Sequence, residues 1–267
     1  GVDTSFAGWD LKGSLVSSSG SFSDTAAGGY LDFDLFATAV ASGAYDPVLG
    51  TGQSALKNTV LHTNFSSVHS VINSLELNAQ HPVFDMKGGA SILSVGAEYA
   101  FSRIKTNFSD IVRSGNGTVT QPNSSDSVVG GPGGAVDSEG DRSNWGLYAE
   151  WRLPLREELS ATASARYDSY SKVHSSTIFN TNVPNPTTGL YDQLPSGDLG
   201  NTFGQATYKL SFHYQPVEML ALRGSIGTGF KVPEISDIAG TLSFGGSTAG
   251  SYACPIPGAP GCLPGNS

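Results

Sequence analysis

A strict alternation of apolar residues with polar or small ones recurs along the chain. In residues 145–153 the odd positions hold Trp145, Leu147, Ala149, Trp151 and Leu153, and the even positions hold Gly, Tyr, Glu and Arg. Because successive side chains of a β-strand point to opposite faces, this pattern predicts a strand with one apolar and one polar face. The same pattern predicts seven strands, at residues 8–18, 68–83, 91–104, 143–154, 158–170, 203–215 and 219–231.

The predicted strands are long and their apolar faces end in aromatic side chains. Most reach about ten residues or more, whereas a tilted strand needs about nine to eleven to cross a bilayer. Aromatic residues at both membrane interfaces are typical of outer-membrane barrels. The aromatic residues expected at these ends are Trp9, Tyr99, Phe101, Trp145, Tyr167, Tyr214 and Phe230.

The composition excludes several classes of protein. The chain has 14 Lys+Arg against 23 Asp+Glu, a net charge of −9, which argues against binding to nucleic acid. Only 14% of residues are charged and 34 are glycine, a balance that disfavours an all-helical enzyme. No run of apolar residues is long enough for a membrane-spanning helix.

The connections between the predicted strands alternate in length. Short links are expected at 85–89, 154–158 and 215–218, and long ones at about 19–68, 105–143, 171–202 and from 232 onward. Short turns on one side and long loops on the other are typical of bacterial outer-membrane barrels, with the short side periplasmic. Within the first long loop, apolar residues at helical spacing predict a short helix at residues 35–42.

The predicted fold class is all-β, an antiparallel up-and-down transmembrane β-barrel with long extracellular loops. Seven strands do not close a single-chain bacterial barrel, which has an even number. We therefore expect residues 1–267 to form part of a larger barrel domain, without a plug domain. A soluble, secreted β-sandwich or β-helix is the alternative fold, although its strands would be shorter and its loops more even.

Four segments resemble one family in its own order along the chain. Residues 220–235 read LALRGSIGTGFKVPEI, a strand and loop entry similar to that of TonB-dependent outer-membrane receptors. Residues 144–159 with 165–171 resemble a hairpin of that family, residues 94–99 (SVGAEY) resemble one of its strands, and residues 43–47 (GAYDP) resemble part of an earlier loop.

This resemblance implies a barrel of about 22 strands that encloses a plug domain. It also implies a location in the outer membrane of a Gram-negative bacterium, with membrane lipid, the protein's own plug, the TonB complex and a small-molecule nutrient as partners. We expect energy-coupled uptake of a large nutrient, first of all a ferric siderophore. A passive porin and a secreted β-rich binding or adhesion module are the alternatives.

The sequence offers no catalytic or cofactor-binding constellation. Its five histidines are scattered without paired-ligand spacing, and the Gly-Thr-Gly at 227–229 leads into Phe-Lys-Val-Pro rather than into a helix. The acidic residues of 137–141 have the oxygen chemistry for a hard cation such as calcium, but solvated acidic loops are commoner. We therefore expect no enzyme activity, no cofactor and no metal site.

The charged residues on the polar side of the strands are expected to line the lumen, because a basic residue facing lipid would cost about 2–4 kcal/mol at midplane. These residues are Lys12, Glu76, Glu98, Glu150, Arg152, Arg166, Asp168, Lys209, Arg223 and Lys231. Among them Arg152, Arg166, Arg223 and Lys231 are candidate ligand-binding residues.

The long loops add three aromatic candidates and a cysteine pair. Tyr191, Phe244 and Tyr252 are candidates for stacking on a ligand ring. Cys254 and Cys262 enclose a segment rich in Pro and Gly, which predicts a small loop-closing disulfide rather than a metal site. The alternative is two free thiols.

Overall fold

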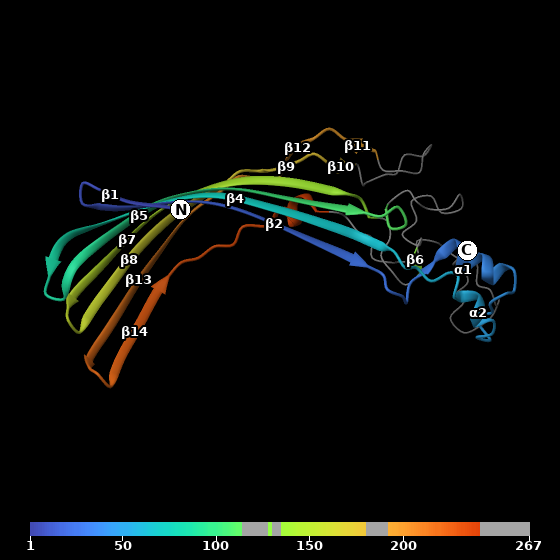
Figure 1. The fold of residues 1–267 in the computed structure, drawn as a ribbon, viewed down its shortest axis with the longest axis horizontal. Coiled ribbons are helices and arrows are strands. Elements are labelled where there is room, and N and C mark those ends of the chain that lie inside the picture. The colour runs from blue at the N-terminus through green and yellow to red at the C-terminus, as the bar shows by residue number, and fades with distance from the viewer. Residues whose placement is uncertain (114–127, 130–134, 180–191, 241–267) are drawn as a thin grey trace, which may run out of the picture.

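The computed structural model describes residues 1–113, 128–129, 135–179 and 192–240, and these residues form mainly one antiparallel sheet (Figure 1). Eight strands follow one another in space in their order along the chain. They are β1 (Val2–Phe6), β2 (Trp9–Thr25), β4 (Asn64–Met86), β5 (Gly89–Phe108), β7 (Ser138–Arg156), β8 (Leu159–Tyr170), β13 (Phe203–Val217) and β14 (Leu220–Gly227). The antiparallel meander predicted from the alternation is confirmed.

The remaining elements belong to the longer connections. Short strands are β3 (Leu31–Asp32), β6 (Val128–Val129), β9 (Val173–Ser175), β10 (Ile178–Phe179), β11 (Gln193–Leu194) and β12 (Gly197–Leu199). Helices are α1 (Phe33–Ala41), α2 (Gln53–Leu56) and α3 (Ile235–Ala239). The helix predicted at 35–42 corresponds to α1, whose N-terminus is capped by Asp32. Among the described residues, no helix has the length and apolar character needed to cross a membrane.

The two ends of the sheet differ sharply in their connections. Each successive hairpin closes at one end through two residues, at positions 7–8, 87–88, 157–158 and 218–219. At the other end the strands are joined through 38 residues between β2 and β4, and through 29 between β5 and β7 (Figure 1). The predicted asymmetry of short turns and long loops is therefore present.

Proline explains the irregular pairing beside three of the tight turns. The register shifts between Pro82 and Asp85, between Leu153 and Arg156, and between Tyr214 and Val217. The last two intervals contain Pro154 and Pro216, and Pro82 borders the first. Since proline has no N–H to donate, it is tolerated in a ladder mainly at bulges and edges.

The structure corrects the predicted number and bounds of the strands. It adds β1, a strand of five residues that the alternation did not reveal, joined to β2 by Ala7 and Gly8 at φ 51° and 83°. Two consecutive positive φ values are those of a type I′ hairpin turn. The predicted strand at 219–231 is also too long, because β14 ends at Gly227.

Most of the eight main strands are longer than a bilayer requires. β4 has 23 residues and β5 has 20, so β4 extends for about 75 Å at roughly 3.3 Å per residue. The long strands continue beyond the tight-turn half of the sheet toward the long loops (Figure 1). The part of these long strands that is nearer the long loops therefore lies outside any apolar layer of ordinary thickness.

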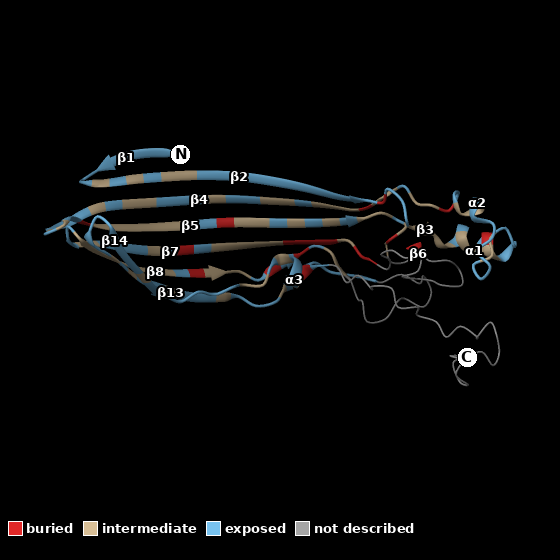
Figure 2. Cartoon of the chain, turned by 90° about the horizontal axis from the view of Figure 1, so that it is seen from below, coloured by how far each residue is buried: buried red, intermediate tan, exposed pale blue. Residues whose placement is uncertain are grey.

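One face of the sheet is apolar and exposed. The register places Leu15, Leu75, Tyr99 and Trp145 side by side across four strands, because each pairs directly with the next. Leu77, Leu147 and Tyr208 also remain exposed. Figure 2 shows exposed and half-buried residues along most of these strands. An apolar surface of this extent requires a non-aqueous neighbour.

Aromatic side chains pack on one another at two levels of the strands. Near the tight turns Trp9 stacks on His81 with ring centroids 5.0 Å apart, and Phe84 meets Trp151 edge-on at 5.8 Å. Further along, Trp145 packs against Tyr167 at 5.6 Å. Two levels of aromatic rings are what a sheet crossing both interfaces of a bilayer presents.

The buried apolar cluster lies away from the main sheet surface, among the long loops. Ala26, Phe65, Val112 and Val128 form its centre. Leu61, Phe108, Ile111 and Tyr30 pack around them. The two-stranded pairing of β3 with β6 joins the first long loop to the second at this point. The loops at this end therefore hold a small core of their own.

The opposite faces of one strand provide a test of the sheet's environment. Leu77→Arg is expected to lower the free energy of unfolding in lipid vesicles by about 2–4 kcal/mol, because it places a cation in the apolar layer. Glu76→Arg, at the adjacent position on the polar face, is expected to change it by less than about 1 kcal/mol. Denaturant titration of both variants measures the difference, and equal losses would contradict the assignment of the faces.

Candidate functional site

The polar face carries its charged residues in rows that run across the strands. One row joins Glu76 of β4, Glu98 of β5, Gly146 of β7 and Asp168 of β8 by direct pairing. Glu76 and Glu98 are like charges placed opposite each other, an arrangement that destabilises a sheet unless a cation lies nearby. Arg166, from the next row, supplies that cation.

Arg166 joins two carboxylates from different strands. Its Nε donates to both carboxylate oxygens of Asp168 at 2.8 and 2.9 Å, and its Nη2 donates to Oε2 of Glu98 at 2.8 Å. Asp168 is only 4% exposed. Charge-assisted bonds of this bidentate kind are the strong ones, so this triad fixes the wall at its centre.

Gly146 makes room for the triad. A Cβ at this position would lie 2.7 Å from Asp168 Oδ1 and 2.8 Å from Arg166 Nη2. A strand residue with a side chain would therefore displace the guanidinium from between the carboxylates. Glycine at a point of close approach is one of its recurrent uses within strands.

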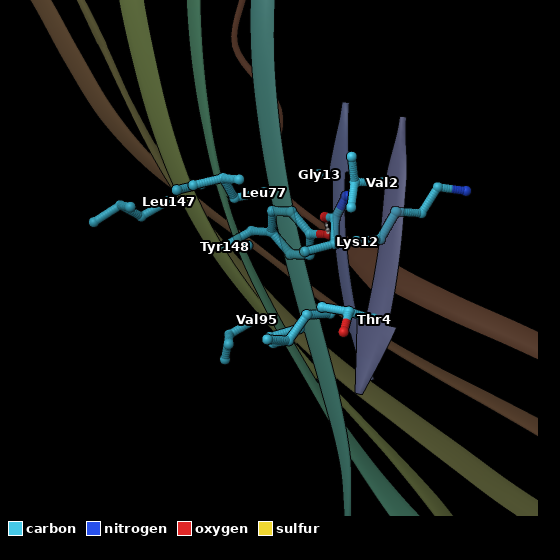
Figure 3. Close-up of a pocket in the computed structure, with 13 residues that line it drawn as sticks. Val2, Thr4, Lys12, Gly13, Leu77, Val95, Leu147 and Tyr148 are labelled. Atoms are coloured by element: carbon cyan, nitrogen blue, oxygen red, sulfur yellow. Dashed lines mark hydrogen bonds between the residues drawn. The ribbon is translucent and has the colours of Figure 1, made fainter. Parts of the chain in front are cut away.

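The row that contains Arg166 also contains a tyrosine, Tyr148, which again lies over a glycine. Tyr148 lies over Gly96, and its hydroxyl donates to Oδ1 of Asn78. Beside it is a hollow of about 700 Å³ lined by residues of β1, β2, β4, β5 and β7 (Figure 3). In Figure 3 Lys12 points away from Leu147 and Val95, as the alternation of faces requires. The polar wall is thus also ordered next to Arg166, which pairs directly with Tyr148.

After β14 the chain folds back across the polar face, and we call residues 228–239 the return segment. Thr228 keeps contact with β13, since its N–H donates to Tyr208 O at 2.9 Å and its hydroxyl accepts from Tyr208 N at 3.1 Å. Phe230 then packs edge-on against Tyr170, with ring centroids 6.1 Å apart. Arg142 lies over the same Tyr170 ring and donates to Pro233 O at 2.9 Å.

The return segment ends in α3, which packs on β7 and β9. A Cβ at Gly140 would lie 2.8 Å from Ile235, 2.9 Å from Ala239 and 3.0 Å from Val173. Glu234 and Asp237 form reciprocal capping bonds at the start of the helix. The chain is therefore held on the polar face by packing as well as by hydrogen bonds.

The candidate ligand residues fall into four groups. Arg166 is held in the triad, whereas Arg152 and Arg223 lie exposed on the polar face. Lys231 lies not on a strand but in the return segment, where it faces Glu234 at 3.9 Å and is largely exposed. Tyr191, Phe244, Tyr252, Cys254 and Cys262 lie outside the described residues.

The return segment is the part of this region that sequence reasoning missed. Phe230 was expected to face outward at the end of an apolar strand, but it packs on Tyr170 at the polar face. The partners Arg142 and Tyr170 had no signal in the sequence that linked them to residues 230–233. The Pro233 and the glycines at 227 and 229 were the available sign that the strand stops early.

The acidic cluster at 137–141 pairs with basic side chains. Glu139 forms ion pairs with Arg103 and with Lys105, the latter at 3.5 Å. Asp137 pairs with Arg113 at 3.1 Å and accepts from Phe108 N at 2.8 Å. Within the described ranges, no group of three or more His, Cys, Asp or Glu side chains has the geometry of a metal site.

Comparison with known proteins gives one match. The family model described as "TonB dependent receptor-like, beta-barrel" matches residues 2–261. No curated protein and no solved structure matches the chain.

The triad provides a test of the wall's stability. Arg166→Met leaves the carboxylates of Asp168 and Glu98 without their shared cation, so we expect the free energy of unfolding to fall by about 1–3 kcal/mol. Arg152→Met, which removes an exposed arginine from the same face, is the matched control and is expected to change it little. Urea titration in detergent measures both, and equal effects would contradict the structural role of Arg166.

The packing of α3 provides a second test. Gly140→Ala is expected to displace α3, because the added methyl group would overlap Ile235 and Ala239. Hydrogen exchange of residues 235–239 should then quicken by about tenfold or more, a loss of about 1.4 kcal/mol of local stability. Gly13→Ala is the control, since its Cβ would meet only Leu77 at 3.5 Å. Unchanged exchange in Gly140→Ala would show that α3 does not depend on this contact.

Proposed function

The chain belongs to the family of TonB-dependent receptor-like β-barrels, and on that premise we propose that it forms part of the wall of a receptor for energy-coupled nutrient uptake. This is a family of receptors and transporters rather than of enzymes. Its members are characteristically found in the outer membrane of bacteria, and we propose the same location for this protein.

The observation that carries this proposal is the separation of the two faces of one continuous sheet. An exposed apolar face with two levels of aromatic rings suits lipid, and the polar face opposite suits a water-filled lumen. The sheet has tight turns at one end and long, partly folded loops at the other, so the two ends suit different functions on the two sides of the membrane. Loops of this length suit capture of a ligand from outside.

The polar wall supports a further element of the proposal, a plug domain within the lumen. A barrel of about 22 strands is wide enough to need one. Residues 1–267 would then be a partial barrel domain whose charged wall faces the plug. Through the plug the TonB complex would supply energy for release of the nutrient.

A ferric siderophore is the proposed cargo, as the commonest nutrient of the family. Tyr191, Phe244 and Tyr252 are proposed to stack on the chelating rings, and Arg152, Arg166, Arg223 and Lys231 to face an anionic complex. A disulfide between Cys254 and Cys262 is proposed to restrict the last loop.

Growth of defined bacterial strains tests the function. A strain that lacks the full-length receptor is expected to lose most uptake of its siderophore under iron limitation, and a strain that lacks TonB should lose it equally. Uptake of labelled ferric siderophore is the measurement. Uptake that persists without TonB would indicate a passive porin, and normal iron uptake with lost growth on complex glycans would overturn the choice of cargo.

A further inference from the structure

A polar pocket lies on β8, β13 and β14, near the tight-turn end of the sheet. Its volume is about 520 Å³. Basic side chains and the hydroxyl groups of four serine or threonine residues border it. The polar residues that line it are Ser160, Thr162, Lys209, Ser211, His213, Arg223 and Ser225. We call it the β13–β14 pocket.

The pairing of the strands places the basic groups around the hydroxyl groups. His213 and Arg223 are directly opposite each other, and Lys209 lies four residues before His213 on the same face. Lys209 and Arg223 are therefore about 13 Å apart along the strands, at roughly 3.3 Å per residue. The rows between them contain Ser211 opposite Ser225. Basic side chains thus stand at both ends of the pocket, and the row of Ser211 and Ser225 lies between them.

The cations of this pocket are unpaired, unlike those of the triad. Among the residues that the structure describes, neither Lys209 nor Arg223 forms an ion pair, whereas Arg166 contacts two carboxylates. In the same part of the chain, Nε2 of His213 is buried without a hydrogen-bond partner. Lys209 and His213 lie on β13, which has a neighbouring strand on each side. Lys209 and Arg223 are both exposed and therefore remain open to a ligand, whereas Nε2 of His213 is covered.

Unpaired cations beside hydroxyl groups select for one kind of ligand chemistry. Arginine and lysine form their strongest hydrogen bonds with carboxylate and phosphate oxygens. The hydroxyl groups of serine and threonine both donate and accept, which suits a ligand that carries hydroxyl groups itself. An uncharged or cationic solute would leave Lys209 and Arg223 unpaired.

We propose that the β13–β14 pocket binds a carboxylate or phosphate group of a hydroxylated solute as that solute moves along the lumen wall. The proposal rests on the proposed function, since it assigns an anionic character to the nutrient that the receptor imports. The pocket lies at the end of the strands opposite the long loops, so the solute reaches it after leaving the loops (Figure 1).

Tartrate and erythritol test the proposal with the purified full-length receptor in detergent. They share a four-carbon skeleton with two central hydroxyl groups, but only tartrate carries carboxylates. Ligand-observed NMR titration is expected to show binding of tartrate and none of erythritol. The double variant Lys209→Gln/Arg223→Gln should weaken tartrate binding by about tenfold or more.

Two controls make the result specific to the pocket. Lys12→Gln removes a basic residue of the polar face outside the β13–β14 pocket and should leave tartrate affinity within about twofold. Lys209→Arg/Arg223→Lys keeps both charges and should restore most of the binding, which shows that the loss does not come from misfolding. Binding that is equal in the wild type and the double Gln variant would overturn the proposal.

The remaining outcomes separate this proposal from the proposed function. Absence of tartrate binding to the wild type would overturn the pocket assignment. Faster hydrogen exchange of the plug domain in the double Gln variant would show that Lys209 and Arg223 contact the plug. The pocket would then not bind a solute, and the proposal would be wrong. None of these binding measurements requires TonB or transport. They therefore test the pocket alone, and the uptake experiment tests the proposed function separately.

Discussion

The antiparallel ladder of backbone hydrogen bonds is the constraint on which the rest of the structure depends. In an apolar layer each backbone N–H and C=O must find a partner within the protein, and consecutive strands that pair in chain order meet this need between them. Once the register is set, the odd or even position of each residue along its strand decides whether it faces the apolar or the polar side. The registers of β4, β5 and β7 therefore determine both the apolar band and the charged rows.

The polar face shows two different ways of placing charge on a wall. Arg166 is surrounded by acceptors from two strands, and Gly146 leaves space for it, so this charge contributes to the stability of the sheet. Lys209 and Arg223 have no ion-pair partner in the part of the chain that the structure describes. Charges without a structural partner are the ones that remain available to a ligand.

The return segment joins the edge strand β14 to the interior strands β7 and β8 of the described sheet. It begins at the end of the last described strand, crosses the polar face, and is held there by Arg142 and by the packing of α3 on Gly140. It occupies space inside the wall, between the long loops and the β13–β14 pocket (Figure 1). On the proposed function, a solute that follows the wall from the loops passes Lys231 and Glu234.

The sequence by itself determined seven of the eight main strands, their two faces and the alternation of short and long connections, because a period of two is a local property of each strand. It also placed Arg152, Arg166 and Arg223 on the polar face by parity alone. Only the tertiary structure decided that Arg166 joins Asp168 to Glu98 and that residues 228–239 turn back onto Arg142 and Tyr170. The contacts of Arg166 with Glu98, of Tyr170 with Phe230 and of Arg142 with Pro233 join residues 60 to 91 positions apart, and no local pattern records which distant side chains a folded sheet brings together.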